Sequence, residues 1–203
     1  MNHFPMSNMG IATPTSRDVK PPENKGRSLL EFPERFIVID LETTGLSPTN
    51  NEIIEIAAVM YEGGIEIGTF CQLVKPELAV SSIITNITGI TNIMLKNAPK
   101  IKAILPDLLK FIGDDILVAH NANFDMSFLS DKFRCHLGHE FNNDFVDTLR
   151  ISRKAYPEFP KHGLAYLCNM IPLENMNSHR ALADCIATYE LFTKCKVRIE
   201  DSI

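Results

Sequence analysis

The chain has 203 residues, 45% of them hydrophobic, and a formal net charge of −5 at pH 7. This length suits one globular domain with a tail, and no apolar run is long enough to cross a membrane. The negative charge argues against a protein that coats long nucleic acid by charge alone, but it permits an enzyme that acts at a chain end.

Residues 1–33 are expected to form a flexible tail, and residues 34–203 one folded domain. The first 30 residues or so are rich in Met, Asn, Pro, Ser and Lys without periodicity, which is typical of a disordered terminus. The N-terminus has no continuous apolar segment of the secretory kind. The five cysteines follow no paired spacing. We therefore expect reduced thiols and a cytoplasmic location, with neither a disulfide framework nor a zinc site.

Three strands are expected to open the domain, over residues 35–41, 53–60 and 65–74. A cluster of Gly, Pro and Asn separates the first two, and Gly63-Gly64 is typical of a hairpin between the second and the third. These strands should pair in antiparallel fashion.

Strand and helix patterns alternate in the rest of the chain. Pro106 is expected to kink or break its helix, Asp147 to cap the helix that follows it, and Asn177 or Ser178 to cap the final helix. Helices are expected over residues 81–87, 99–112, 123–134, 148–155, 164–170 and 181–196, and short strands over 116–119 and 145–146. This order predicts an α/β fold of the ribonuclease H kind, a mixed sheet flanked by helices.

The first strand ends in two carboxylates, those of Asp40 and Glu42. Because side chains alternate along a strand, both carboxylates point to the same face. Two like charges side by side repel each other and contribute nothing to a core. A divalent cation is the usual remedy, so the pattern predicts half of a metal site.

Two further acids follow short apolar segments. Asp125 lies in the first turn of its helix, just after a strand, where ligands bind in open α/β sheets; alone, it would equally suit a carboxylate that stabilises the helix N-terminus. Asp184 lies in the first turn of the final helix, and alone it fits a solvated helix face. His179 does not share a helix face with Asp184, but it lies at the helix start, where it can turn toward a site and take a proton from water. Taken singly, His179 fits a surface histidine.

The combination of these residues is specific. Asp-x-Glu at residues 39–46, Asp in residues 118–129 and His-x4-Asp at residues 179–184 follow one another in order. This series resembles the DEDDh exonucleases, the DnaQ-like 3′–5′ proofreading superfamily that includes the epsilon subunit of bacterial DNA polymerase III. Histidine in the third motif indicates the h subclass. The resemblance covers about residues 34–195, and weaker similarities lie in residues 87–91, 147–149 and 162–167.

The resemblance implies a two-metal hydrolysis. Hard oxygen ligands suit Mg²⁺ or Mn²⁺, and two such ions roughly 3.5–4 Å apart can flank a phosphodiester. The implied metal ligands are the four acids, and the implied general base on the attacking water is His179. The implied products are a nucleoside 5′-monophosphate and a chain shorter by one. The residues carried over as ligands are Asp40, Glu42, Asp125 and Asp184.

Other residues are expected to support this site. The resemblance places the backbone of Thr43 near the terminal nucleotide and makes Leu46 and Ile90 candidates to pack on the terminal bases; ordinary core or loop residues are the alternative for both. His120 is expected to order the turn before the second motif through hydrogen bonds. Glu55, on an otherwise apolar strand, is either part of a structural ion pair or a support for the ligands.

Three functions fit these motifs. The first is a 3′–5′ exonuclease on DNA, in proofreading or repair; the second is an RNA-trimming enzyme similar to oligoribonuclease or ribonuclease T. The contacts to the 2′-OH that separate the two are not readable from the sequence. The third is a non-catalytic binding or scaffold subunit, against which the complete set of five residues counts. The expected partner is the 3′ end of a single-stranded nucleic acid, with DNA favoured over RNA, and a polymerase or other replication protein is a further candidate.

Overall fold

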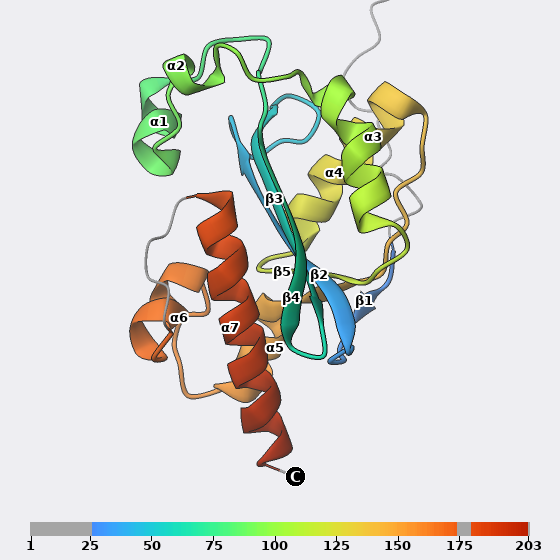
Figure 1. Ribbon diagram of the computed structural model, residues 1–203. Helices are drawn as coiled ribbons and strands as arrows, with labels where there is room; N and C mark the ends of the chain where they lie inside the picture. Colours follow the sequence, from blue (N-terminus) through green and yellow to red (C-terminus); the bar gives the residue numbers. More distant parts are fainter. Residues whose placement is uncertain (1–25, 174–179, 203) are drawn as a thin grey trace, which may run out of the picture.

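The computed structural model describes residues 26–173 and 180–202, which fold around one mixed sheet (Figure 1). Six strands lie in the order β1-β6-β5-β2-β3-β4. Strands β2, β3 and β4 pair in antiparallel fashion, whereas β5 pairs with β2, β6 with β5, and β1 with β6, all in parallel. The strands are β1 (Ser28–Leu29), β2 (Arg35–Thr43), β3 (Ile53–Glu62), β4 (Ile65–Leu73), β5 (Leu117–Ala119) and β6 (Phe145–Asp147). This confirms the expected fold class.

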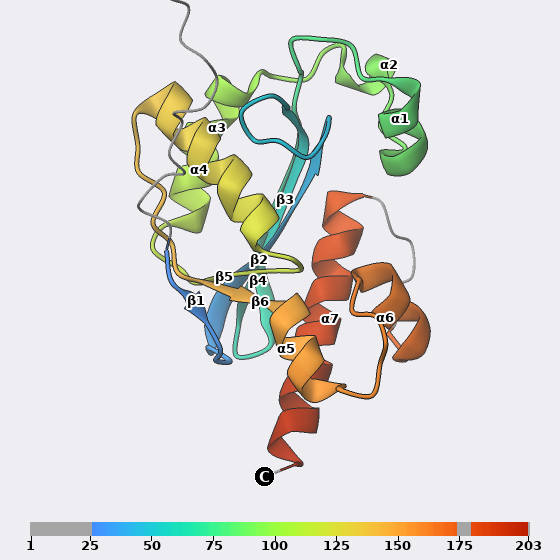
Figure 2. The ribbon, with the colours of Figure 1, turned by 180° about the vertical axis from the view of Figure 1, so that it is seen from behind.

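Helices cover both faces of the sheet (Figures 1 and 2). Helices α3 and α4 pack on one face and helices α5 to α7 on the other, while α1 and α2 lie at the end of the molecule where α7 begins. In the described residues the helices are α1 (Ser82–Thr88), α2 (Asn92–Leu95), α3 (Ile101–Ile112), α4 (Asn123–Leu137), α5 (Thr148–Ala155), α6 (Leu164–Met170) and α7 (Ala181–Glu200). None of them is long and apolar enough to span a membrane.

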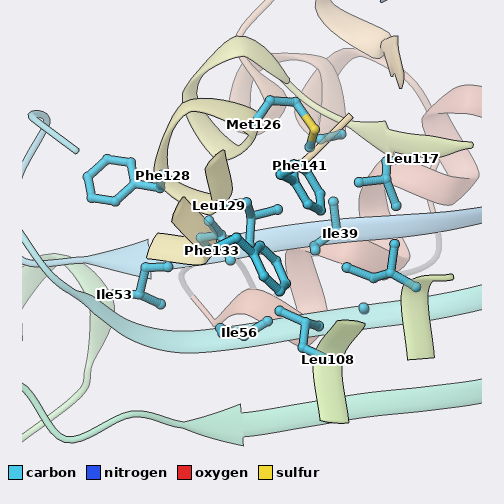
Figure 3. Packing of buried hydrophobic residues seen from close by; sticks show 14 of the residues in the cluster. Ile39, Ile53, Ile56, Leu108, Leu117, Met126, Phe128, Leu129, Phe133 and Phe141 are labelled. Atoms are coloured by element: carbon cyan, nitrogen blue, oxygen red, sulfur yellow. The ribbon is translucent and has the colours of Figure 1, made fainter. Parts of the chain in front are cut away.

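The strand alternation of β2 divides the core into two clusters. Ile37, Ile39 and Leu41 face α3 and α4. In this cluster the side chains of Ile39, Leu129 and Phe141 lie around Phe133 (Figure 3). Phe36 and Val38 belong to the second cluster, beneath α7 and α5. Burial of these apolar side chains is the main favourable contribution to folding, at roughly 25 cal/mol per Å².

Three local expectations need correction. Helix α3 runs without a break through Pro106, because Leu105 and Leu108 are fully buried on the sheet and hold the helix on both sides of the missing N–H. Helix α7 begins at Ala181 with Arg180 as its N-cap, whose side chain makes no cap hydrogen bond. The expected caps Asn177 and Ser178 lie outside the described residues. Helix α2 was not expected.

Strand β1 lies inside the range expected to be a tail. The N–H of Phe145 donates to the carbonyl of Arg27 at 2.9 Å, and the guanidinium of Arg27 is paired with Asp144 at 2.7 Å. A two-residue strand is too short to stand out in the sequence, and its position depends on the partner strand β6. The sheet therefore starts before residue 34, and the division into tail and domain otherwise stays a prediction, since residues 1–25 are not described.

Candidate active site

Asp40 and Glu42 lie on the face of β2 that α7 covers. Their even-numbered neighbours Phe36 and Val38 belong to the cluster under α7, so the same face of the strand changes from apolar to acidic toward its carboxyl end. Both carboxylates are half-buried. The strand alternation thus brings two acids to the place where the helix begins.

Small side chains let α7 lie close to the strand. Ala181 and Cys185 are fully buried, and the thiol of Cys185 contacts the carbonyl oxygen of Ala57 at 3.4 Å. Asp184, in the first turn of α7, is thereby brought to the acids of β2. One carboxylate oxygen from each of Asp40, Glu42 and Asp184 lies within 4.8 Å of the others. Such a set of oxygens can hold a divalent cation.

Asp125 approaches from the other face, in the first turn of α4. The turn before it is fixed by Asn121, which has a φ of 63° and donates its backbone N–H to the carboxylate of Asp147 at 3.0 Å. The same oxygen of Asp147 also caps α5, as expected, by accepting the N–H of Leu149 at 3.0 Å. Asp125 is 3% exposed. It is not one of the three acids within 4.8 Å, but its charge acts strongly on Asp40.

The acids are electrostatically strained. Burial raises the pKa of Asp40 well above its usual range, and neighbouring negative charges raise it further; in order of effect they belong to Asp125, Asp184, Glu42 and Glu55. Burial, then the charges of Asp184 and Glu55, raise the pKa of Glu42 to about 7, while Arg180 opposes them. Burial likewise raises the pKa of Asp125, against the backbone N–H groups of Asp125 and Leu41. Bound cations would relieve this repulsion.

An ion pair between β3 and α7 holds the helix at the site. Glu55, directly across from Glu42 in the sheet, is 1% exposed. Its carboxylate accepts hydrogen bonds from Nε and Nη2 of Arg180, at 3.0 and 2.5 Å, and from the N–H of Ala181 at 3.1 Å. Glu55 therefore caps α7 from another strand and fixes the turn that carries Asp184. The expected structural ion pair of Glu55 is observed, and its contact with the N–H of Ala181 lies three residues before Asp184.

Comparison with known proteins identifies the domain. Residues 37–192 match the model of the exonuclease family, RNase T type. The chain belongs to the exonuclease family. The DNA polymerase III subunit epsilon of Aquifex aeolicus is 39% identical to this exonuclease domain over 159 residues, which are 79% of this chain and 79% of that protein.

Longer relatives contain a similar segment. The PolC-type DNA polymerase III of Bacillus subtilis is 44% identical over 172 residues, and that of Caldanaerobacter subterraneus is 40% identical over 176 residues. These segments are 84% and 87% of this chain but 12% of each polymerase. The exonuclease domain thus spans about an eighth of the length of these relatives.

Solved structures share the fold. Exonuclease X, in complex with 5′ overhanging duplex DNA, is 28% identical with a TM-score of 0.64 over 80% of this chain and 92% of that one. Exonuclease I of E. coli, in complex with a dT13 oligonucleotide, gives a TM-score of 0.71 at 21% identity over 84% of this chain and 43% of that one. The second likeness shows the fold alone.

The other expected site residues of the exonuclease domain are placed as follows. His179 lies outside the described residues. Thr43 is nearly buried, and its hydroxyl donates to the carbonyl of Gly45 at 2.7 Å. Leu46 is 85% exposed, whereas Ile90 is fully buried in a small core with Ile54, Val80 and Leu95. The burial of Ile90 supports the alternative of an ordinary core residue and counts against a direct contact with a base.

Two further polar residues, His120 and Arg180, support the site through hydrogen bonds. Nδ1 of His120 lies 2.9 Å from the hydroxyl of Thr148, so this histidine ties the end of β5 to α5 as expected. Burial lowers the pKa of His120. Arg180 was not singled out, although it lies inside the third motif; the available signal was the lone carboxylate of Glu55 on an apolar strand, which requires a cation.

Proposed function

We propose that the domain removes nucleoside 5′-monophosphates one at a time from the 3′ end of single-stranded DNA, by hydrolysis that depends on two divalent ions, with Mg²⁺ as the first choice. The observation that carries this proposal is the convergence of three carboxylate oxygens from β2 and α7 within 4.8 Å. An all-oxygen set of this kind suits Mg²⁺ or Mn²⁺ better than zinc.

The four acids would hold the ions, with Asp40 central because it feels the charge of every other member of the cluster. When bound, the ions would activate the attacking water and stabilise the leaving 3′ oxygen. The chain's own groups would orient the reaction: Glu55 and Arg180 fix Asp184, and the turn closed by Asp147 fixes Asp125. His179 would accept the proton of the attacking water.

The substrate end would lie against the turn after β2. There the exposed side chain of Leu46 is available to the terminal nucleotide, and the backbone of Thr43 would approach it. The similarity to an epsilon subunit and to a protein solved with DNA supports DNA as the substrate. It also supports a DNA polymerase as partner and proofreading in the cytoplasm as the setting.

A degradation assay tests the proposal. The protein is incubated with 5′-labelled single-stranded DNA or RNA of equal sequence, in Mg²⁺, Mn²⁺ or a chelator. We expect a ladder of single-nucleotide losses from the 3′ end of DNA, abolished by the chelator and by Asp184→Ala. Activity that survives the chelator would falsify the metal dependence, and faster loss of RNA would move the assignment to the RNA-trimming relatives. An unchanged rate and pH profile in His179→Ala would remove this histidine as the base.

A further inference from the structure

Lys132 is a buried lysine that the acid cluster does not explain. Lys132 lies in α4 and is 8% exposed. Its ammonium group donates to the carbonyl oxygens of Pro48 at 2.6 Å and Asn51 at 3.0 Å, and to the carboxylate of Asp131 at 3.1 Å. An ammonium has three N–H donors, so the hydrogen bonds of this buried cation are complete.

The two carbonyl groups belong to the loop of residues 44–52 between β2 and β3. This loop is also closed on itself: the N–H of Asn51 donates to the carbonyl of Ser47 at 2.8 Å, and the N–H of Ser47 donates to the side chain of Asn51 at 3.0 Å. A Cβ at Gly45 would lie 2.6 Å from the amide nitrogen of Asn51, so the chain packs tightly there. The loop therefore behaves as one rigid piece, which Lys132 binds as a whole.

This lysine connects two elements that carry acids. Helix α4 bears Asp125 in its first turn and Lys132 about two turns later. The loop directly continues β2, which carries Glu42, and it presents the exposed Leu46 just before its clamped part. Lys132 thus joins the loop that carries Leu46 to the helix that carries Asp125, in addition to the hydrogen bonds that tie the start of this loop to β2 and to the residue before β3.

Stability alone is a poor reason for this arrangement. Removing an ammonium from water costs several kcal/mol, and the three hydrogen bonds of Lys132 must first offset this cost. The ammonium also lies 5.9 Å from the ring of Phe128, a cation–π contact that favours the charge. What the ammonium adds is a direct link between helix and loop, because it donates to two backbone carbonyls of the loop at once.

We propose that Lys132 is a positioning residue for the substrate: it fixes the loop of residues 44–52 so that Leu46 meets the base of the 3′-terminal nucleotide. The inference rests on the proposed exonuclease function, and it concerns the strength of substrate binding and not the chemical step. Lys132 touches neither the acids nor the reacting phosphodiester.

The test compares two substrates in Mg²⁺. Lys132→Met keeps the length of the side chain and removes its donors. For a single-stranded oligodeoxynucleotide we expect KM to rise about tenfold, with kcat within about twofold. For bis(p-nitrophenyl) phosphate, a diester without a base, we expect kcat/KM to stay unchanged. An equal loss on both substrates, or no loss on either, overturns the proposal.

A double-mutant cycle identifies the route of the effect. Leu46→Ala alone is expected to raise KM for the oligonucleotide, and adding Lys132→Met should then have much less effect than it has in the wild type. Effects on KM that simply multiply would show that Lys132 does not act through Leu46. The matched control is Lys110→Met, which removes an exposed lysine of helix α3. It should leave both substrates unaffected.

Amide hydrogen exchange gives a readout without catalysis. Lys132→Met should speed exchange in residues 44–52 and leave β2 and α7 unchanged. If the wild-type protein degrades no nucleic acid, the proposed function fails. Unchanged amide exchange in residues 44–52 of Lys132→Met would separately show that Lys132 does not fix the loop. If Lys132→Met does not fold, Lys132→Arg keeps the charge and displaces the donors. KM for the oligonucleotide should still rise, and an unchanged KM counts against the proposal.

Discussion

Two ion pairs hold elements that carry members of the acid cluster, and they join different parts of the fold: in one, only the carboxylate of Glu55 is buried, and in the other, Lys132 and Asp131 are both buried. Glu55 and Arg180 join β3 to the start of α7, with the carboxylate also capping the helix. Lys132 joins α4 to the loop after β2, with two of its three bonds made to backbone carbonyls. The first pair fixes a helix that bears Asp184 of the acid cluster; the second fixes a loop that bears no member of this cluster. Under the proposed function, the first pair would help to hold the ions and the second would help to hold the substrate.

The largest effect is expected when one negative charge is removed from the acid cluster. Asp40→Asn should lower the exonuclease rate about a thousandfold or more. It should also raise the melting temperature of the metal-free protein, because one charge leaves a crowded cluster whose burial and neighbours raise the pKa of Asp40. Calorimetry in a chelator, together with the degradation assay, measures both effects. A fall in the metal-free melting temperature would contradict the repulsion.

The next effect is expected at Arg180. Arg180→Met leaves Glu55 buried and unpaired beside the cluster, which should cost about 3 kcal/mol of unfolding free energy. The catalytic rate should fall on both the oligonucleotide and bis(p-nitrophenyl) phosphate, since the turn with Asp184 loses its anchor. Urea unfolding and steady-state kinetics measure the two losses. A rise in KM with unchanged kcat would contradict this expectation, because Arg180 would then act on substrate binding as Lys132 is proposed to do.

The free energy of unfolding should depend on pH through the clustered acids and not through Lys132. The pKa of Glu42 is raised to about 7, whereas an unfolded glutamate titrates near 4.3. Between these values the metal-free folded protein keeps a proton that the unfolded chain has lost, so the free energy of unfolding should fall as pH rises through this window. We expect the melting temperature in a chelator to drop by several degrees between about pH 5 and about pH 8.

Mg²⁺ or Mn²⁺ should reduce this fall, because cations offset the charges that form as the pH rises. Glu42→Gln should show a shallower slope, and Lys132→Met should keep the wild-type slope. A metal-free melting temperature that rises over the same window would contradict the raised pKa of Glu42.

The smallest effect is expected on the exposed loop residue. Leu46→Ala should change the free energy of unfolding by no more than about 0.5 kcal/mol, because the side chain is 85% exposed. Ile90→Ala should cost about 2 to 4 kcal/mol, because that side chain is fully buried. Chemical denaturation of the two variants tests the assignment of one residue to the substrate side and the other to the core. Equal losses of unfolding free energy in the two variants would contradict the assignment of Leu46 to the surface and Ile90 to the core.

Local patterns predicted most of the fold and most of the acid positions. The period of two in β2 was enough to place Asp40 and Glu42 on one face. Asp125 and Asp184 lie at helix starts, but only the family resemblance of the combined motifs assigned them to the same site. The start of α7 at Ala181 was also predicted, but its cap was not, because the capping carboxylate comes from Glu55, far away in the sequence. The two-residue strand β1 and the burial of Ile90 likewise depend on partners that only the folded chain supplies.

Strand β2 is central in the sheet, paired with β5 on one side and with β3 on the other. Its amide groups between Ile37 and Leu41 are covered by both hydrophobic clusters. Their hydrogens should therefore exchange with solvent only when the whole domain opens, and they should be among the slowest in the molecule. The strand that delivers the first two acids is then part of the last structure to come apart on denaturation.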